Sequence, residues 1–283
     1  DGWTYPPFEG RIADGKIYGR GTTDDKGPLI ASLFALKAIK DAGIRLKRRI
    51  RIIFGTDEES GSHDMIRYKE TEELPVMAFT PDADYPVIFS EKRLVNLKLT
   101  RNLQADSAKW TLAMAKGGNV VNQVPDSAQL LLQRGEEQIH LQGKGMAAHG
   151  SVPEIGENAI DDLMKKLTQH SCFAECSETL KAFAAFYMEH LYASWDGRGF
   201  DVCCNDRELG RSTFNTALLY GDEEKIQLTL DCRFPASLDV ETPLQKMKEA
   251  GERSSILVEA VKNKTGPVHA QRSSISRDIA KGL

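Results

Sequence analysis

Acidic side chains gather in three short segments near the beginning of the chain. The segment GRGTTDDKG (residues 19–27) places Asp24 and Asp25 next to each other in a glycine-rich turn. Three consecutive acids occur in GTDEESG (residues 55–61), and two more occur in TPDAD (residues 80–84). Carboxylates packed together repel one another unless a cation compensates their charge or one of them binds a proton. Because carboxylate oxygens bind divalent cations, including zinc, the pattern predicts a carboxylate-rich metal site.

Helix capping is the ordinary explanation for a pair of aspartates before a helix, and it stays open for Asp24 and Asp25. Aspartate accepts hydrogen bonds from the free backbone N–H groups of a first helical turn and complements the partial positive charge there. Solvation of a loop, however, does not need the three consecutive acids of residues 55–61. A cation-binding role is therefore the stronger hypothesis for the three segments together.

The elements that would position these acids alternate between strands and helices. We expect a hairpin at residues 11–18, a helix at 28–43, a strand at 49–54, a helix after Ser62 and a strand at 76–79. Strands separated by helices indicate an α/β domain over residues 1–92, with a mostly parallel sheet covered by helices. Ligands bind at the carboxyl edge of such a sheet, so the acids that follow successive strands are expected to converge there.

A second domain with a different pattern is predicted over residues 93–240. Its expected strands lie at 94–99, 127–133, 138–142 and 225–233, and its expected helices at 158–170 and 178–192. This combination indicates an antiparallel sheet backed by helices, which is an α+β domain. The chain becomes polar and loses clear periodicity after residue 251, and we assign residues 241–283 to a return toward the first domain.

Composition narrows the class of protein. The 283 residues include 37 Lys and Arg against 41 Asp and Glu, and a net charge of −4 lacks the basic excess of a nucleic-acid binder. No run of about 18 apolar residues occurs, so we expect no membrane-spanning helix. Five cysteines are an odd number and too sparse for a disulfide scaffold, and the first residues do not resemble a signal peptide. These features predict a cytoplasmic protein.

The three acidic motifs, taken in order, resemble those of the co-catalytic di-zinc exopeptidases of metallopeptidase family 20, which include ArgE, DapE, carnosinases and carboxypeptidase G-type enzymes. The sequence is most similar to the PepV-type bacterial dipeptidases, through DDKGP (residues 24–28) and TDEESG (residues 56–61). The resemblance extends from the first residues to about Ser237. It implies an α/β catalytic domain that carries an inserted α+β lid domain.

The resemblance also implies a role for each acid. Asp24 matches the carboxylate that bridges two divalent metal ions, whereas Glu59 and Asp82 each match a ligand of one ion. The implied ions are zinc, with manganese or cobalt as alternatives. Glu58 matches the general base, which suits an unligated carboxylate beside an activated water. Asp25 would then support the ligands or cap the helix.

Three residues of the second domain match positions of the family's lid. His149 in QGKGMAAHGSVP matches the histidine that reaches the active site, where it can polarise the scissile carbonyl and stabilise the oxyanion. Asn122 in GGNVVNQVP and Arg233 in DCRFP match residues that contact the substrate, and a guanidinium suits a peptide carboxylate. An exposed loop histidine and a surface ion pair are the ordinary alternatives for His149 and Arg233. The resemblance also implies self-association through the lid.

The sequence departs from the family pattern at two further metal ligands, both histidines. One belongs to a His-x-Asp motif and the other lies near the C-terminus of family members. None of the six histidines here is followed two residues later by Asp, and His269 has different neighbours from the C-terminal ligand. We therefore expect a chain cut at both ends, whose oxygen-only ligand set binds zinc poorly. On this expectation the chain alone has little or no activity.

The leading hypothesis is metal-dependent hydrolysis of dipeptides by an activated water with a glutamate base. The alternative is a catalytically inactive relative that acts as a binding or assembly module. A carboxylate–magnesium phosphohydrolase is a weaker third hypothesis, because no phosphate-binding loop accompanies the acids.

Overall fold

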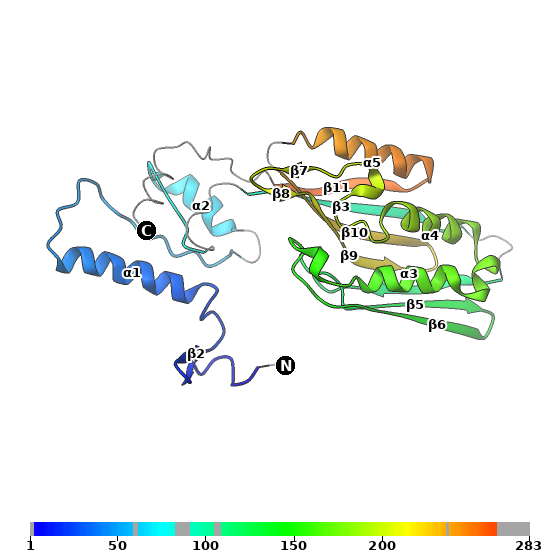
Figure 1. Cartoon of the computed structure of the whole chain (residues 1–283), viewed down its shortest axis with the longest axis horizontal. Coiled ribbons are helices and arrows are strands. Elements are labelled where there is room, and N and C mark those ends of the chain that lie inside the picture. Colours follow the sequence, from blue (N-terminus) through cyan, green and yellow to red (C-terminus); the bar gives the residue numbers. More distant parts are fainter. Residues whose placement is uncertain (1–2, 59–61, 83–90, 105–108, 236–237, 265–283) are drawn as a thin grey trace. The chain divides into compact units, whose positions relative to one another are not determined.

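Two units make up the chain, one built from residues 1–88 and the other from residues 89–282. The computed structural model describes residues 3–58, 62–82, 91–104, 109–235 and 238–264 (Figure 1). Glu59, Asp84 and His269, all of which belong to the predicted motifs or candidate ligands, lie outside the described residues.

The first unit begins with the predicted hairpin. Strands β1 (Arg11–Ala13) and β2 (Lys16–Tyr18) pair in antiparallel orientation. Asp14 and Gly15 form the turn with positive φ angles of 49° and 71°, as both central residues of a type I′ turn require. Local turn chemistry therefore determines this hairpin.

Helices α1 (Lys26–Asp41) and α2 (His63–Thr71) confirm the two helices predicted for this unit. Pro28 lies in the first turn of α1. Backbone N–H groups there have no acceptor within the helix, so the N–H group that proline lacks is not needed. The helix ends just before Gly43, which has a φ of 67° that glycine adopts without a steric penalty. Start and stop residues in the sequence thus set the ends of α1.

The predicted strands at residues 49–54 and 76–79 do not form in the described part of this unit. The described residues there contain a single sheet, the antiparallel β1–β2 pair, so the expected parallel sheet is not seen. Phe54 is 56% exposed and Val76 is 85% exposed. A strand needs a neighbouring backbone to pair with, and an apolar run alone does not specify that partner.

An antiparallel sheet of seven strands dominates the second unit (Figure 1). The strands lie in the order β11-β3-β10-β9-β4-β5-β6. Their bounds are Arg93–Asn102 (β3), Thr111–Gly117 (β4), Ser127–Arg134 (β5), Glu137–Lys144 (β6), Thr213–Gly221 (β9), Lys225–Phe234 (β10) and Leu257–Lys264 (β11). Two short strands, β7 (Asn205–Asp206) and β8 (Gly210–Arg211), pair separately. All four strands predicted for this unit are present.

Helices α3 (Ala159–Gln169) and α4 (Glu178–His190) are also confirmed, and α5 (Glu241–Arg253) is an additional helix. Asn158 and Ser177 cap α3 and α4 by accepting backbone N–H hydrogen bonds. The helices and the strands share one apolar core, whose largest buried side chains are Tyr187, Phe183, Phe186 and Phe234. Within the described ranges, no helix is both long and apolar enough to cross a membrane.

The structure differs from the sequence-based assignment at residues 241–264, which belong to the second unit. Here α5 packs beside β11, and β11 pairs with β3. The sequence pattern also does not predict β4 or β9. Register shifts interrupt the pairing of β4, β9 and β11, and an extra residue in a strand disturbs the alternation by which a strand is recognised.

Candidate active site

Strand β10 sends alternate side chains to opposite faces of the sheet. Leu230 and Cys232 face the core and are at most 1% exposed, so Asp231 and Arg233 lie on the other face. There the Arg233 Nη2 donates a hydrogen bond to the Asp231 Oδ2 at 3.0 Å. The Asp231 side chain is 1% exposed and that of Arg233 is 17% exposed. Arg233 therefore forms a largely buried ion pair, not the surface pair that its sequence context also allowed.

A row of buried polar side chains crosses the sheet through Asp231. The strand register places Asn96 of β3 on one side of Asp231 and Asn215 of β9 on the other. All three residues are at most 7% exposed. The Asn215 Nδ2 donates to the carbonyl oxygens of Gln123 at 2.8 Å and Val121 at 3.4 Å. Asn215 thus fixes the loop before β5 to this face of the sheet.

Two loop segments pair with each other beside this row. Gln123 and His149 form an antiparallel bridge, and the Gly150 N–H donates to the Asn122 carbonyl at 2.7 Å. A Cβ atom on Gly150 would lie 2.7 Å from the Asp231 Oδ2. Glycine is therefore needed at position 150 for the His149 segment to approach the buried carboxylate so closely.

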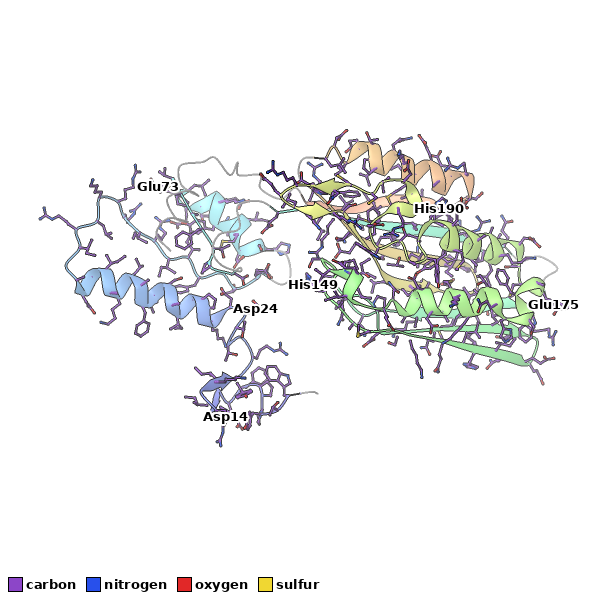
Figure 2. All side chains as sticks on the ribbon, viewed as in Figure 1. Asp14, Asp24, Glu73, His149, Glu175 and His190 are labelled. Carbon is purple, nitrogen blue, oxygen red and sulfur yellow. The ribbon has the colours of Figure 1, made fainter. Side chains whose placement is uncertain are left out.

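The His149 side chain, labelled in Figure 2, lies at an exposed loop position, and its surroundings favour the neutral imidazole. Burial lowers the pKa of His149 below its ordinary value, the Arg233 guanidinium lowers it further, and Asp231 offsets part of this effect. The structure thus brings the predicted residues Asn122, His149 and Arg233 to one region of the second unit. Their roles remain predictions.

Ser151 makes two contacts with the Nδ1 atom of His149. The Ser151 backbone N–H donates to the His149 Nδ1 at 3.3 Å, and the Ser151 Oγ lies 2.6 Å from the same atom. In the tautomer in which Nδ1 accepts this backbone N–H, the neutral ring carries its proton on Nε2. His149 therefore presents an N–H donor of the kind that stabilises an oxyanion.

Sequence reasoning missed Asp231, Asn215 and Ser151. Asp231 lies within the DCRFP motif, directly beside a core residue, and a carboxylate in an apolar strand is a signal of burial with a partner. Asn215 carried no local signal, because its hydrogen bonds reach a loop that is distant in the sequence.

Asp24 and Asp25 occupy the turn immediately before α1 (Figure 2). Asp25 is the N-cap residue, yet its side chain makes no capping hydrogen bond. Its Oδ1 atom is buried and has no hydrogen-bond partner among the described residues. The Asp24 side chain is exposed. Capping therefore does not account for this pair of acids, and a bound cation would supply the partner that Asp25 lacks.

Asp57 stabilises the loop that carries Glu58. Its Oδ2 accepts a hydrogen bond from the His63 backbone N–H at 2.8 Å and also lies 2.8 Å from the His63 Nδ1. The Asp57 carboxylate therefore satisfies a free N–H group at the start of α2. One of the three consecutive acids thus has a structural role, and the next, Glu58, is exposed.

The acidic residues of the first unit fit a divalent cation by ligand type. Asp24 and Asp82 offer the carboxylate oxygens that divalent ions bind, and the buried oxygen of Asp25 lies beside the first of them. Among the described residues, no group of three His, Cys, Asp or Glu side chains lies close enough together to hold an ion. Glu59, the third predicted ligand, is not among these residues.

The mixed α/β fold with a large antiparallel sheet is that of a known class of peptidase. The model of Peptidase family M20/M25/M40 matches residues 1–272, and the chain belongs to this family. The family generally uses divalent metals.

Curated relatives carry dipeptidase names. "Putative dipeptidase YtjP" of Bacillus subtilis is 32% identical over 281 aligned residues, covering 89% of this chain and 60% of the relative. "Putative dipeptidase SAR1836" of Staphylococcus aureus is 33% identical, covering 95% of this chain and 62% of the relative. The chain thus spans about three fifths of the length of these relatives.

A solved structure supports the fold. The aminoacylhistidine dipeptidase from Vibrio alginolyticus superposes with a TM-score of 0.51 at 13% sequence identity. The likeness covers 96% of this chain and 65% of that protein. At this identity the comparison concerns the fold and not the chemistry.

Proposed function

We propose that this protein is a metal-dependent dipeptidase whose first unit belongs to the catalytic domain and whose second unit is the lid. Asp24, Glu59 and Asp82 are the proposed ligands of two divalent ions, for which the family resemblance implies zinc, with manganese or cobalt as alternatives. Family membership and the dipeptidase names of the relatives support a short peptide as the substrate.

The observation that carries this proposal is the environment of His149. Its neutral ring is held by Ser151 and offers the Nε2 proton, while the Asp231 carboxylate orients the Arg233 guanidinium. An N–H donor suits the carbonyl oxygen of a scissile peptide, and a guanidinium suits the terminal carboxylate. Both groups are features of a site that binds a short peptide with a free carboxyl end.

Proton transfer is the task of Glu58. When bound, the divalent ions supply a water of lowered pKa near neutral pH. Glu58 would serve as the general base, holding a proton on its carboxylate that it could pass to the leaving amine. Asp57, fixed by His63, holds the loop on which Glu58 is placed.

The test of this proposal is metal-dependent hydrolysis. The purified chain is freed of metal, titrated with zinc or manganese, and assayed against a panel of dipeptides. Because two histidine ligands of the family pattern have no match here, we expect turnover well below about 1 s⁻¹. A chimaera in which the remaining segments of the Bacillus subtilis relative flank this chain is expected to show metal-dependent turnover in the ordinary enzyme range. A chimaera that binds metal and cleaves no dipeptide contradicts the proposal.

Replacement of His149 tests the proposed role of the lid. In the chimaera, His149→Ala is expected to lower kcat more than it raises KM, because the Nε2 proton is used when charge develops on the carbonyl oxygen. Steady-state kinetics measures both constants. His140→Ala, at an exposed position on β6, is the matched control and should leave both unchanged. An unchanged kcat for His149→Ala would show that His149 is an ordinary loop histidine without a role in the reaction.

A further inference from the structure

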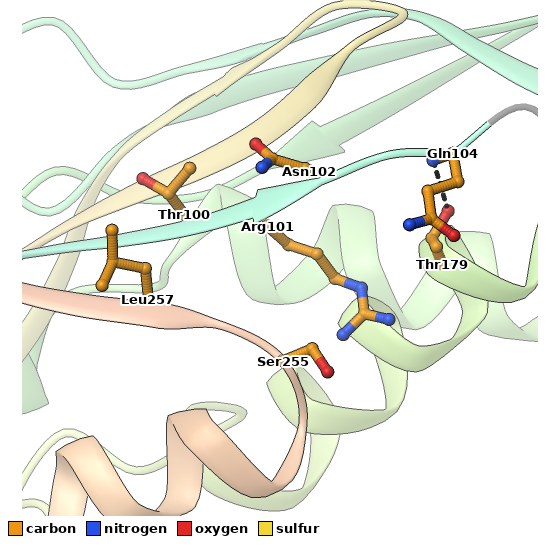
Figure 3. Close-up of a pocket in the computed structure, with 7 residues that line it drawn as sticks. All are labelled: Thr100, Arg101, Asn102, Gln104, Thr179, Ser255 and Leu257. Atoms are coloured by element: carbon orange, nitrogen blue, oxygen red, sulfur yellow. Dashed lines mark hydrogen bonds between the residues drawn. The ribbon is translucent and has the colours of Figure 1, made fainter.

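A pocket of about 380 Å³ lies at the end of β3 in the second unit (Figure 3). The residues that line it come from β3 and the segment just after it, from the start of α4, from the turn after α5 and from the first residue of β11: Thr100, Arg101, Asn102, Gln104, Thr179, Ser255 and Leu257. None of them belongs to the proposed peptidase site. The volume is at the small end of the range for ligand pockets in proteins.

Arg101 is the charged group among the residues that line this pocket, and no acidic side chain of the described residues pairs with it. Its Nη1 donates to the Ser254 carbonyl oxygen, which is a neutral acceptor. Its Nε is buried and has no hydrogen-bond partner, and no carboxylate in the described part of the chain forms an ion pair with it. Burial lowers the pKa of Arg101 without a compensating acidic neighbour. A partly buried guanidinium of this kind is costly unless an anion pairs with it.

The other groups of the pocket are neutral or favour an anion. Figure 3 shows the Arg101 guanidinium between Ser255 and the first turn of α4, where Thr179 lies. The positive end of the α4 dipole therefore adds to the charge of Arg101. Glu178 also belongs to that turn, but its side chain is 82% exposed, and its Oε1 accepts a hydrogen bond from the Lys181 Nζ at 2.5 Å. The Gln104 N–H donates to the Thr179 Oγ1 at 3.2 Å, which holds this side of the pocket in place.

We infer that this pocket is a second binding site, separate from the peptidase chemistry, for a small oxyanion such as a carboxylate or a phosphate. Arg101 supplies the charge, and Ser255, Thr179 and Gln104, which lie on the same side of β3 as Arg101, supply hydrogen-bonding groups, whereas Thr100 and Asn102 point to the other side of the strand (Figure 3). A guanidinium pairs with either oxyanion through two parallel N–H donors.

Calorimetric titration of the metal-free chain with sodium phosphate, and separately with sodium acetate, tests this inference. Removal of metal with a chelator prevents either anion from binding through a metal ion. We expect saturable binding of one anion per chain, and a comparison of the two anions identifies whether phosphate or carboxylate is preferred. Absence of saturable binding for both anions overturns the inference.

Two variants locate the binding. Arg101→Met should weaken anion binding at least tenfold, whereas Lys98→Met should leave it within about twofold, because Lys98 lies on the opposite face of the same strand. Gln104→Glu keeps Arg101 and places a carboxylate in the pocket. It should raise the unfolding temperature and weaken anion binding at least tenfold. Binding by Arg101→Met or Gln104→Glu that equals the wild type overturns the inference.

Discussion

Glu58→Gln is expected to lower dipeptide turnover by about 10²–10⁴ in the chimaera while its metal content stays the same. The amide cannot accept the proton that the carboxylate takes from water, so the chemical step slows. The Glu58 side chain is exposed and follows Asp57, whose carboxylate is engaged by His63 at the start of α2. The substitution should therefore leave the loop intact. Steady-state kinetics and elemental analysis of the same preparation measure the two quantities.

A matched control separates the loss of a base from the loss of a charge. Glu70 is an exposed residue of α2 that forms an ion pair with Arg67 at 3.2 Å. Glu70→Gln removes the same charge from the same unit and should leave turnover unchanged, because exposed pairs contribute little. Wild-type turnover in Glu58→Gln, or a loss of metal from it, would show that Glu58 is not the base.

Asp231→Ala is expected to lower the free energy of unfolding by about 3–5 kcal/mol. The Asp231 side chain is 1% exposed, and its removal leaves the guanidinium of Arg233, which is 17% exposed, without its carboxylate partner. The His149 segment should also lose its position, because Gly150 packs against the same carboxylate. Chemical denaturation followed by circular dichroism measures the change in stability.

The control for this prediction is an ion pair of similar length at the surface. Asp201 lies 2.9 Å from Lys246, and its side chain is 97% exposed. Asp201→Ala should change the unfolding free energy by less than about 1 kcal/mol. Adding Arg233→Met to Asp231→Ala should recover part of the lost stability, because no buried charge is then left unpaired. Equal effects of Asp231→Ala and Asp201→Ala would contradict the account of the buried pair.

Local patterns in the sequence predicted the elements whose determinants lie close together along the chain. The Asp14–Gly15 turn, the proline and glycine at the ends of α1, and the periodicity of α3 and α4 each concern only a few neighbouring residues. The motifs around Asp24 and Glu58 likewise identified the peptidase family. Such features can be read from sequence because turn and cap preferences act over one or two turns of backbone.

Pairing between distant segments could not be predicted in the same way. Strand β11 joins the sheet at β3, and a register shift near Ala260 disturbs its alternation. In the first unit, by contrast, strands were predicted that the described structure does not contain. Their apolar runs predict burial, yet in the described structure no neighbouring strand covers them. A hydrophobic pattern indicates that a residue favours burial, but it does not identify the segment that buries it.

The residue types of the candidate site were identified from the sequence alone, and the chemistry assigned to them stays a prediction. His149, Asn122, Arg233 and the acidic motifs could be identified without any coordinates. Only the tertiary structure decided that Arg233 is buried against Asp231, that Asn215 holds the loop of Asn122, and that Ser151 contacts the Nδ1 of His149. The physical reason is that hydrogen bonds and burial depend on strand register and loop pairing across the sheet, which residue types by themselves do not specify.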